Sequence, residues 1–272
     1  YFNSTFTDFV AGVPIDKVIA RNGSAVANAL GIRKLKQETA TDLSGGFTAR
    51  YGNFSTTVDG YYVQIKNRIV LTGAFSDSAT VVDHLAQLGV GAAQFFTNAI
   101  DTRTRGIDIV LNYAESFGEH RLYTSLSANF NHMNLSAVHT NALLAGREAD
   151  YFGSREKRFL LASAPKSKIN WTTDYKYNQW SANLQLVRFG KVVLENWNLN
   201  GDKDIYDAKI VTNITFGYDL TKNIFVNAGA ANVFNVYPDK HDPGLTESGG
   251  IWDAVQMGFS GRFIFSRIGF KF

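Results

Sequence analysis

Three carboxylates in one short segment could bind a hard metal ion. Asp202, Asp204 and Asp207 lie within the stretch GDKDIYD, which contains no other acidic residue. Ca²⁺ takes about six to eight oxygen ligands, but an EF-hand loop also needs a central Gly and a distal Glu that this stretch lacks. The segment is therefore either a candidate Ca²⁺ site or a hydrated acidic loop, and no other cofactor is expected.

Three large aromatic side chains in connecting segments could stack against a flat ligand. These side chains are Trp252, Trp197 and Tyr151. Their ring faces suit sugars and aromatic rings, while their polar atoms can stay hydrated. The alternative is that the two tryptophans pack within their loops or belong to an aromatic belt at a membrane surface. The position of Trp197, directly after a predicted strand, favours this second interpretation.

A basic stretch could attract an anionic ligand. Arg155, Lys157 and Arg158 follow one another closely, and Glu156 lies among them. Guanidinium groups bind carboxylates and phosphates through paired hydrogen bonds, and clustered cations raise the local concentration of anions. The sequence therefore places Arg155 and Arg158 among the candidate ligand-binding residues, with a solvated loop of mixed charge as the alternative.

Composition excludes several other kinds of chemistry. The chain has no cysteine, five scattered histidines and no G-x-S-x-G motif, so no thiolate site and no nucleophile–base pair is expected. The net charge of +3 comes from 27 basic and 24 acidic residues without a long block of one sign, which gives no case for nucleic acid. We therefore predict that the protein is not an enzyme and does not bind nucleic acid.

The elements that must position these residues are amphipathic strands. In the segment 168–177, apolar Ile169, Trp171 and Tyr175 alternate with polar neighbours, and a two-residue turn leads into a second alternating segment, 180–186. Such runs recur along the chain over about 10 to 14 residues, the length of a tilted strand that crosses a bilayer. No apolar run approaches the roughly 18 residues of a transmembrane helix.

The spacing of the segments predicts nine strands joined by alternating short turns and long loops. The long connections cover residues 72–101, 136–165, 195–207 and 237–260. Short turns on one rim and long loops on the other are typical of a transmembrane barrel whose long loops face outward. The sequence thus predicts an all-β fold, a transmembrane antiparallel β-barrel. Its strands occupy residues 39–272, and residues 1–38 form an extracellular loop region that follows a further strand.

Four motifs carry a resemblance to TonB-dependent outer-membrane receptors. The segment LKQET at 35–39 resembles the L-K-P-E-T segment of these receptors, with Gln37 in place of proline. TRTRGID at 102–108 is similar to their A-R-T-R-G-V-E strand start, and ANVFNVYP at 231–238 to their N-L-F-D-K-x-Y strand end. The last strand, 261–272, resembles their terminal strand. The four motifs occur in the expected order and cover about residues 35 to 272.

The resemblance implies a barrel of about 22 strands around a plugged lumen, of which this chain supplies the C-terminal nine. It implies active transport of a scarce nutrient, such as a siderophore, cobalamin or a glycan, across the outer membrane of a Gram-negative bacterium. TonB would supply the energy by contacting a plug-bearing region outside this chain. Outer-membrane lipid and lipopolysaccharide would surround the barrel. The alternatives are a passive porin-like or scaffold barrel without TonB coupling, or a soluble β-sandwich that binds a ligand.

The C-terminal strand also resembles the signal that the barrel-assembly machinery reads, in which aromatic residues alternate and Phe ends the chain. The matching residues are Ile268, Gly269, Phe270 and Phe272. The simpler interpretation is that the apolar side chains among them only face lipid. The two interpretations are compatible, because a strand that templates assembly is also a membrane strand.

Overall fold

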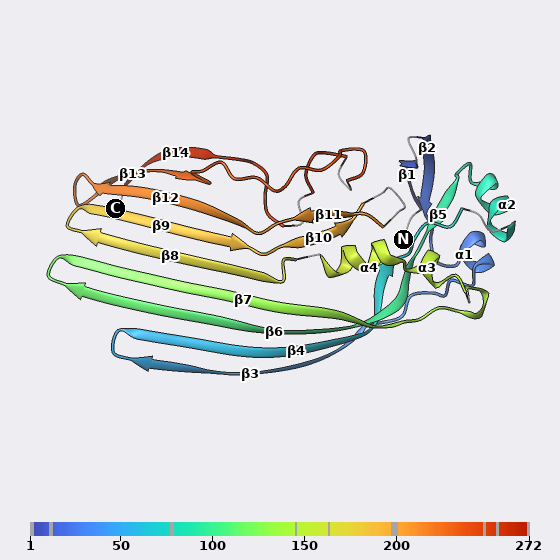
Figure 1. The fold of residues 1–272 in the computed structure, drawn as a ribbon, viewed down its shortest axis with the longest axis horizontal. Helices are drawn as coiled ribbons and strands as arrows, with labels where there is room; N and C mark the ends of the chain where they lie inside the picture. The colour runs from blue at the N-terminus through green and yellow to red at the C-terminus, as the bar shows by residue number, and fades with distance from the viewer. Residues whose placement is uncertain are drawn as a thin grey trace.

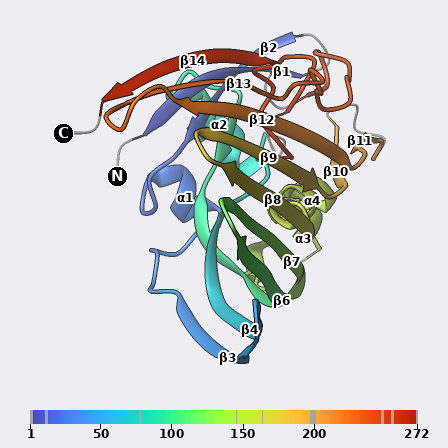
Figure 2. The same cartoon turned by 90° about the vertical axis from the view of Figure 1, so that its left-hand side faces the viewer.

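The computed structural model is dominated by one antiparallel sheet of nine strands, in the order β14-β13-β12-β9-β8-β7-β6-β4-β3. This confirms the predicted strand number and the all-β class. Figure 2, which looks along the strands, shows the sheet curved into an open trough. Among the described residues, no helix is both long and apolar enough to span a membrane. The described residues are 3–10, 13–76, 79–144, 146–162, 164–196, 201–246, 249–253 and 256–270.

Each strand of the large sheet pairs antiparallel with the next one, and β3 and β14 form its two edges. The sheet is therefore not closed into a barrel by the described residues. The strands are β3 (Thr39–Tyr51), β4 (Phe54–Leu71), β6 (Phe96–Phe117), β7 (His120–Val138), β8 (Ser167–Tyr177), β9 (Trp180–Phe189), β12 (Lys209–Asp219), β13 (Ile224–Ala231) and β14 (Phe263–Phe270).

All the short turns lie at one end of the sheet, as Figure 1 shows. The turn between β3 and β4 uses Gly52 at φ 55°, and the turn between β8 and β9 uses Asn178 at φ 50°. Gly and Asn tolerate this left-handed conformation at low cost, so two residues are enough to reverse the chain. The predicted alternation of short turns and long connections is confirmed, and we call the two ends of the sheet the turn end and the loop end.

The two faces of the sheet differ sharply in polarity. On one face, Ile107 lies opposite Phe130, and Leu111 opposite Leu126, and all four side chains are exposed. On the other face Asn129 donates a hydrogen bond of 2.6 Å to Asp108. Contiguous exposed apolar surface is unfavourable in water but favourable against lipid hydrocarbon. We call these the apolar face and the polar face.

Aromatic rings gather at the turn end of the sheet. The ring centroids of Phe54 and Tyr113 are 4.5 Å apart, as are those of Trp180 and Tyr218. The imidazole of His120 stacks on Tyr177 at 4.3 Å. Rings with one polar atom suit the boundary between hydrocarbon and water, so this cluster forms an aromatic belt at the edge of the apolar band.

The loop end carries a small folded unit in place of free loops. Strands β1 (Ser4–Val10) and β2 (Val13–Ile19) form a hairpin, and β5 (Ala92–Gln94) pairs parallel with β2. Helices α1 (Ala25–Ala29) and α2 (Ala79–Gln87) complete it. The described residues of 1–38, predicted as an extracellular loop region, thus include two strands and a helix, because their apolar residues find partners more than 60 residues later in the chain; their extracellular location stays a prediction.

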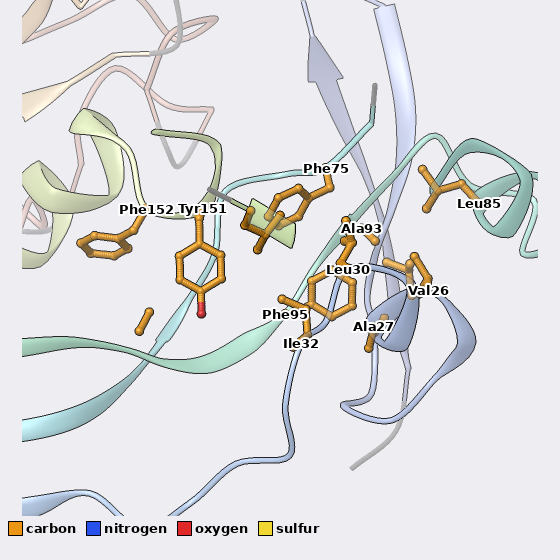
Figure 3. Packing of buried hydrophobic residues seen from close by; sticks show 14 of the residues in the cluster. Val26, Ala27, Leu30, Ile32, Phe75, Leu85, Ala93, Phe95, Tyr151 and Phe152 are labelled. Carbon is orange, nitrogen blue, oxygen red and sulfur yellow. The ribbon is translucent and has the colours of Figure 1, made fainter. Parts of the chain in front are cut away.

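Apolar side chains from these elements form the loop-end core, which Figure 3 shows. Phe75 and Phe95 are fully buried, with ring centroids 6.1 Å apart. The guanidinium of Arg147 lies 5.9 Å from the centre of the Phe75 ring and links a third long connection to the core. The core contains Val18, Ala20, Val26, Ala27, Leu30, Ile32, Phe75, Leu85, Ala93, Phe95, Ala99, Ile100, Leu144, Tyr151 and Phe152.

Two of the other long connections, 136–165 and 195–207, also contain or adjoin short elements. Residues Ala142–Leu144 form a 3-10 turn, and helices α3 (Glu148–Tyr151) and α4 (Ser154–Leu161) follow it. Strands β10 (Val192–Glu195) and β11 (Lys203–Tyr206) make a separate hairpin. Val192, Leu194 and Tyr206 of this hairpin form a second buried cluster with Ala162.

Replacement of Gly106 by valine is expected to reduce assembly of the barrel. A Cβ at this position of β6 would collide with the ring of Tyr61 and lie 2.7 Å from the carbonyl oxygen of Phe130. Overpacking of this kind costs about 1–3 kcal/mol. The fraction of heat-modifiable protein on SDS gels measures assembly. The matched control is Gly60→Val, because the nearest atom to a Cβ at Gly60 is 3.8 Å away; equal yields of both variants would contradict the prediction.

Candidate functional site at the loop end

A cavity of about 770 Å³ opens at the loop end, where segments distant in the sequence meet. Phe6 and Lys17 line it from the β1–β2 hairpin, and the end of β4 contributes residues 69–72. Helix α4 adds Arg155, and the long connection before β14 adds Pro243, Gly244 and Thr246. This volume is within the range that holds small organic ligands.

The lining combines aromatic rings with charged groups. Phe96 and Phe159 line the cavity, and both remain partly exposed. Arg155 and Glu156 also line it, and Glu156 accepts a hydrogen bond of 3.0 Å from the backbone N–H of Gly153. That bond caps the first turn of α4, so one carboxylate oxygen of Glu156 is already occupied by the helix backbone. The arrangement can hold a ligand with flat rings, but it offers no nucleophile paired with a base.

The two candidate arginines lie in different places. Arg155 faces the large cavity, whereas Arg158 lines a separate one of about 290 Å³ together with Lys166 and Lys191. The Nε atom of Arg158 also lies 3.8 Å from a carboxylate oxygen of Glu195 on β10. The two residues therefore do not act on one ligand in this arrangement, and Arg155 is the better placed of the pair.

Tyr151 is not available as a stacking surface. Its side chain belongs to the loop-end core and is 4% exposed, and its hydroxyl lies 2.8 Å from the Thr97 hydroxyl. Burial raises the pKa of the Tyr151 phenol above its ordinary value, and the bond to Thr97 opposes that shift. The sequence predicted that Tyr151 lies in a loop. The α3 turn instead directs its ring into the loop-end core, where the ring packs among apolar side chains.

Trp252 already stacks on rings of its own chain. Its ring lies 5.0 Å from that of Tyr237 at an interplanar angle of 6°, and 5.9 Å from that of Phe259. These contacts fit the alternative in which Trp252 packs within its loop, and they leave ligand stacking on it as an untested prediction. Trp197 lies outside the described residues.

The three carboxylates do not converge on one point. Asp204 is buried in β11, where it accepts a hydrogen bond of 3.2 Å from Asn196 and lies 3.5 Å from His241. Asp207 is exposed and pairs with Lys191 at 3.0 Å. Asp202 is exposed directly before β11, the second strand of the hairpin. Within the ranges that the structure describes, no group of three His, Cys, Asp or Glu residues is placed to hold a metal ion.

A polar cluster that the sequence did not reveal fixes the last long connection to β11. The hydroxyl of fully buried Tyr206 donates a hydrogen bond of 3.2 Å to Asp253, and its ring meets that of His241 edge-on at 4.7 Å. Burial, and then the charge of Asp253, raise the pKa of the Tyr206 phenol far above its ordinary value. The partners lie more than 30 residues apart, so no local pattern could have indicated them.

Gln256 strengthens the same attachment. Its side-chain amide donates hydrogen bonds of 2.8 Å to the carbonyl oxygens of Gly190 and Asp207. His241 adds a contact of 3.1 Å between its Nε2 and the carbonyl oxygen of Ile205. The connection between β13 and β14 is therefore held against the β10–β11 hairpin by several buried polar contacts, and we call this set the hairpin lock.

The residues of the predicted assembly signal lie on the edge strand β14. Ile268 pairs with Val226 and Phe270 with Ile224, and both side chains are exposed on the apolar face. A Cβ at Gly269 would collide with the ring of Phe225. Phe272 lies outside the described residues, and recognition by the assembly machinery stays a prediction.

The sequence pattern of the family described as TonB dependent receptor-like, beta-barrel, matches residues 1–236, most of the chain. The chain belongs to this family of TonB-dependent receptors. Its localisation is the outer membrane of Gram-negative bacteria, so the apolar face of the sheet lies against the hydrocarbon of that membrane. No curated protein matches the chain.

Solved structures of receptors share the fold. The ferric enterobactin receptor PfeA of Pseudomonas aeruginosa, in complex with enterobactin, has a TM-score of 0.58 at 14% identity and covers 94% of this chain. The copper transporter OprC has a TM-score of 0.56 at 17% identity, and the outer membrane transporter YddB of Escherichia coli 0.55 at 13%; each covers 88%. The chain spans 32% to 33% of the length of these three structures.

Proposed function

We propose that the receptor carrying this chain imports a scarce nutrient across the outer membrane with energy supplied through TonB. The cavity at the loop end carries the proposal, because it lies on the side of the apolar band where the long connections gather and is sized for a small ligand. We infer that TonB acts on a region outside this chain. The role needs no covalent chemistry.

The lining of the cavity favours an anionic ligand that carries flat rings, such as a ferric siderophore. Arg155 and Lys17 provide positive charge, and the exposed rings of Phe96 and Phe159 provide ring surfaces. Structures with the same fold include a ferric enterobactin receptor, a pyoverdine receptor and a copper transporter. Cobalamin and glycans are the other nutrients that we consider, and they would use the aromatic rings more than the charge.

Replacement of Arg155 by alanine is expected to weaken uptake of an anionic chelate. A hydrogen bond to a charged group contributes about 1.5–3 kcal/mol, which corresponds to roughly a tenfold to hundredfold increase in the ligand concentration at half-maximal uptake. The measurement is uptake of radiolabelled ferric enterobactin, cobalamin and an oligosaccharide by cells that produce the intact receptor. The matched control is Arg158→Ala, which removes the same group from the separate cavity.

The same assay separates active import from the alternative of a passive or scaffold barrel. Treatment with a protonophore is expected to abolish concentrative uptake, because TonB draws on the proton gradient of the inner membrane. Uptake that persists without the gradient would favour a passive channel. Uptake that responds to Arg158→Ala but not to Arg155→Ala would move the ligand site to the smaller cavity.

A further inference from the structure

A compact loop between β13 and β14 forms one wall of the large cavity at the loop end. Pro243, Gly244 and Thr246 of this loop line the cavity. The described residues of the β10–β11 hairpin, by contrast, are not among those that line it. We call the described residues 241–246 and 249–251 the cavity loop. A ligand in the cavity would thus contact this loop but not the hairpin that the loop is attached to.

The cavity loop is held together by its own hydrogen bonds. The backbone N–H of His241 donates a hydrogen bond of 3.0 Å to the carbonyl oxygen of Ile251, which joins the two ends of the loop. Thr246 is buried, and its hydroxyl donates a hydrogen bond of 2.6 Å to the carbonyl oxygen of Gly250. Its backbone N–H donates to the carbonyl oxygen of Asp242 at 3.2 Å. Because the loop is tied internally, a shift at its ends would also move its cavity wall.

Side chains outside the cavity fix both ends of this loop. Before the loop, Asp239 accepts a hydrogen bond of 2.7 Å from the backbone N–H of Asp207 and forms an ion pair with Lys209. After it, Asp253 and Gln256 make the buried contacts of the hairpin lock. The connection is therefore attached to the β10–β11 hairpin and to the start of β12, beside which it runs in Figure 1.

His241 makes the attachment closest to the cavity wall, two residues before Pro243. Its Nε2 lies 3.1 Å from the carbonyl oxygen of Ile205, and a carbonyl oxygen only accepts, so Nε2 carries the hydrogen of this bond. Its Nδ1 lies 3.5 Å from the carboxylate of Asp204, and its ring meets that of Tyr206 edge-on. The imidazole does not line the cavity itself, but it fills the space between the cavity loop and β11.

We propose that His241 is a positioning residue for ligand binding. It holds the cavity loop against β11 and so determines where Pro243, Gly244 and Thr246 lie around a bound ligand. A binding group has to be held within about 0.5 Å of its productive position. The affinity of the receptor is then set in part by a hairpin that the ligand does not contact. This inference rests on the proposed function, since it concerns the same cavity.

The experiment compares two variants of His241 by uptake of radiolabelled ferric enterobactin into cells that produce the intact receptor. His241→Ala is expected to raise the ligand concentration at half-maximal uptake roughly tenfold, because the loop loses its bond to β11. The maximal rate per assembled receptor should stay unchanged. His241→Gln should remain within about threefold of the unmodified receptor, because its amide N–H can replace the Nε2–H that bonds to Ile205.

Two further variants separate positioning from folding. Tyr206→Phe removes only a hydroxyl of the hairpin lock, again outside the cavity, and should raise the half-maximal concentration a few-fold. The matched control is His139→Ala, since His139 also pairs with a carboxylate, that of Asp101 at 3.0 Å, but does not line this cavity or contact the cavity loop. Heat modifiability measures the amount of assembled receptor, to which each uptake rate is normalised.

The proposal is overturned if His241→Ala and Tyr206→Phe leave the half-maximal concentration unchanged, or if His139→Ala raises it as much as His241→Ala. It is also overturned if His241→Gln is as impaired as His241→Ala, because the bond to Ile205 would then not be what positions the loop. Failure of the proposed transport looks different: the unmodified receptor itself would show no saturable uptake of ferric enterobactin, cobalamin or an oligosaccharide, and the inference would fall with it.

Discussion

Replacement of Phe75 by alanine is expected to open the loop-end core while leaving the nine-stranded sheet assembled. Phe75 is fully buried, its ring lies near that of Phe95 and near the guanidinium of Arg147, and it therefore links the long connections 72–101 and 136–165 within the loop-end core. Truncation of a buried phenylalanine to alanine lowers the free energy of unfolding by about 3–5 kcal/mol. That cost is comparable to the whole stability of a small folded unit, so the core should become accessible to protease at residues 3–38 and 73–95.

Protease treatment of intact cells that produce the receptor provides the measurement, with fragments mapped by mass spectrometry. The sheet should remain heat-modifiable, because its stability comes from hydrogen bonds between strands and from lipid. The matched control is Val82→Ala on α2, since Val82 is largely exposed. An unchanged cleavage pattern in the Phe75 variant, or loss of the heat-modifiable band, would contradict the idea that this core folds as a separate unit.

Replacement of Tyr206 by alanine is expected to release the hairpin lock. The change leaves a cavity in the second cluster and removes the phenol that donates to buried Asp253. The alanine variant should lose about 3–5 kcal/mol of the free energy that holds the lock together. Tyr206→Phe keeps the ring and should lose about 1–3 kcal/mol, because only the hydrogen bonds between the hydroxyl and Asp253 disappear. The segment 237–260 should then be cleaved faster by protease, in the order alanine, phenylalanine, unmodified protein.

The comparison between the two Tyr206 variants tests the physical basis of the lock. Equal cleavage of the alanine and phenylalanine variants would show that the hydrogen bond to Asp253, and not the ring, holds the connection. Cleavage that is unchanged in both variants would show that the remaining contacts of Gln256 and His241 are sufficient. Ile205→Ala is the control, because this neighbouring side chain is exposed on the other side of β11.

The large sheet was predictable because each strand carries its own signal. In β8, Ile169 and Trp171 alternate with Lys168 and Asn170. This alternation alone indicates which side of the strand meets lipid, without information from any other strand. The turns add a second local signal, as at Asn178, where the left-handed backbone needs Asn or Gly. The strand number and the positions of the first hairpin followed from these local patterns.

The loop-end core could not be predicted because its signal is not local. Strand β5 has three residues, and it pairs with Lys17–Ile19 across more than 70 positions of sequence. Tyr151 illustrates the same limit within the candidate site: its type suggested a ligand surface, but distant Thr97 and the core determine where the ring lies. Arg155 lies on helix α4 and lines the large cavity, but its role as a ligand-binding residue stays a prediction.

The unequal lengths of the strands give the sheet a high side and a low side. Strands β4, β6 and β7 contain 18, 22 and 19 residues, whereas β8, β9 and β12 contain 11, 10 and 11. At about 3.3 Å per residue, the high side extends roughly 25–35 Å further than the low side. A solute that approaches along the membrane surface would therefore meet the long strands on one side, and on the other side the small β10–β11 hairpin with the connection that the hairpin lock holds against it. The direction of approach thereby becomes part of selectivity.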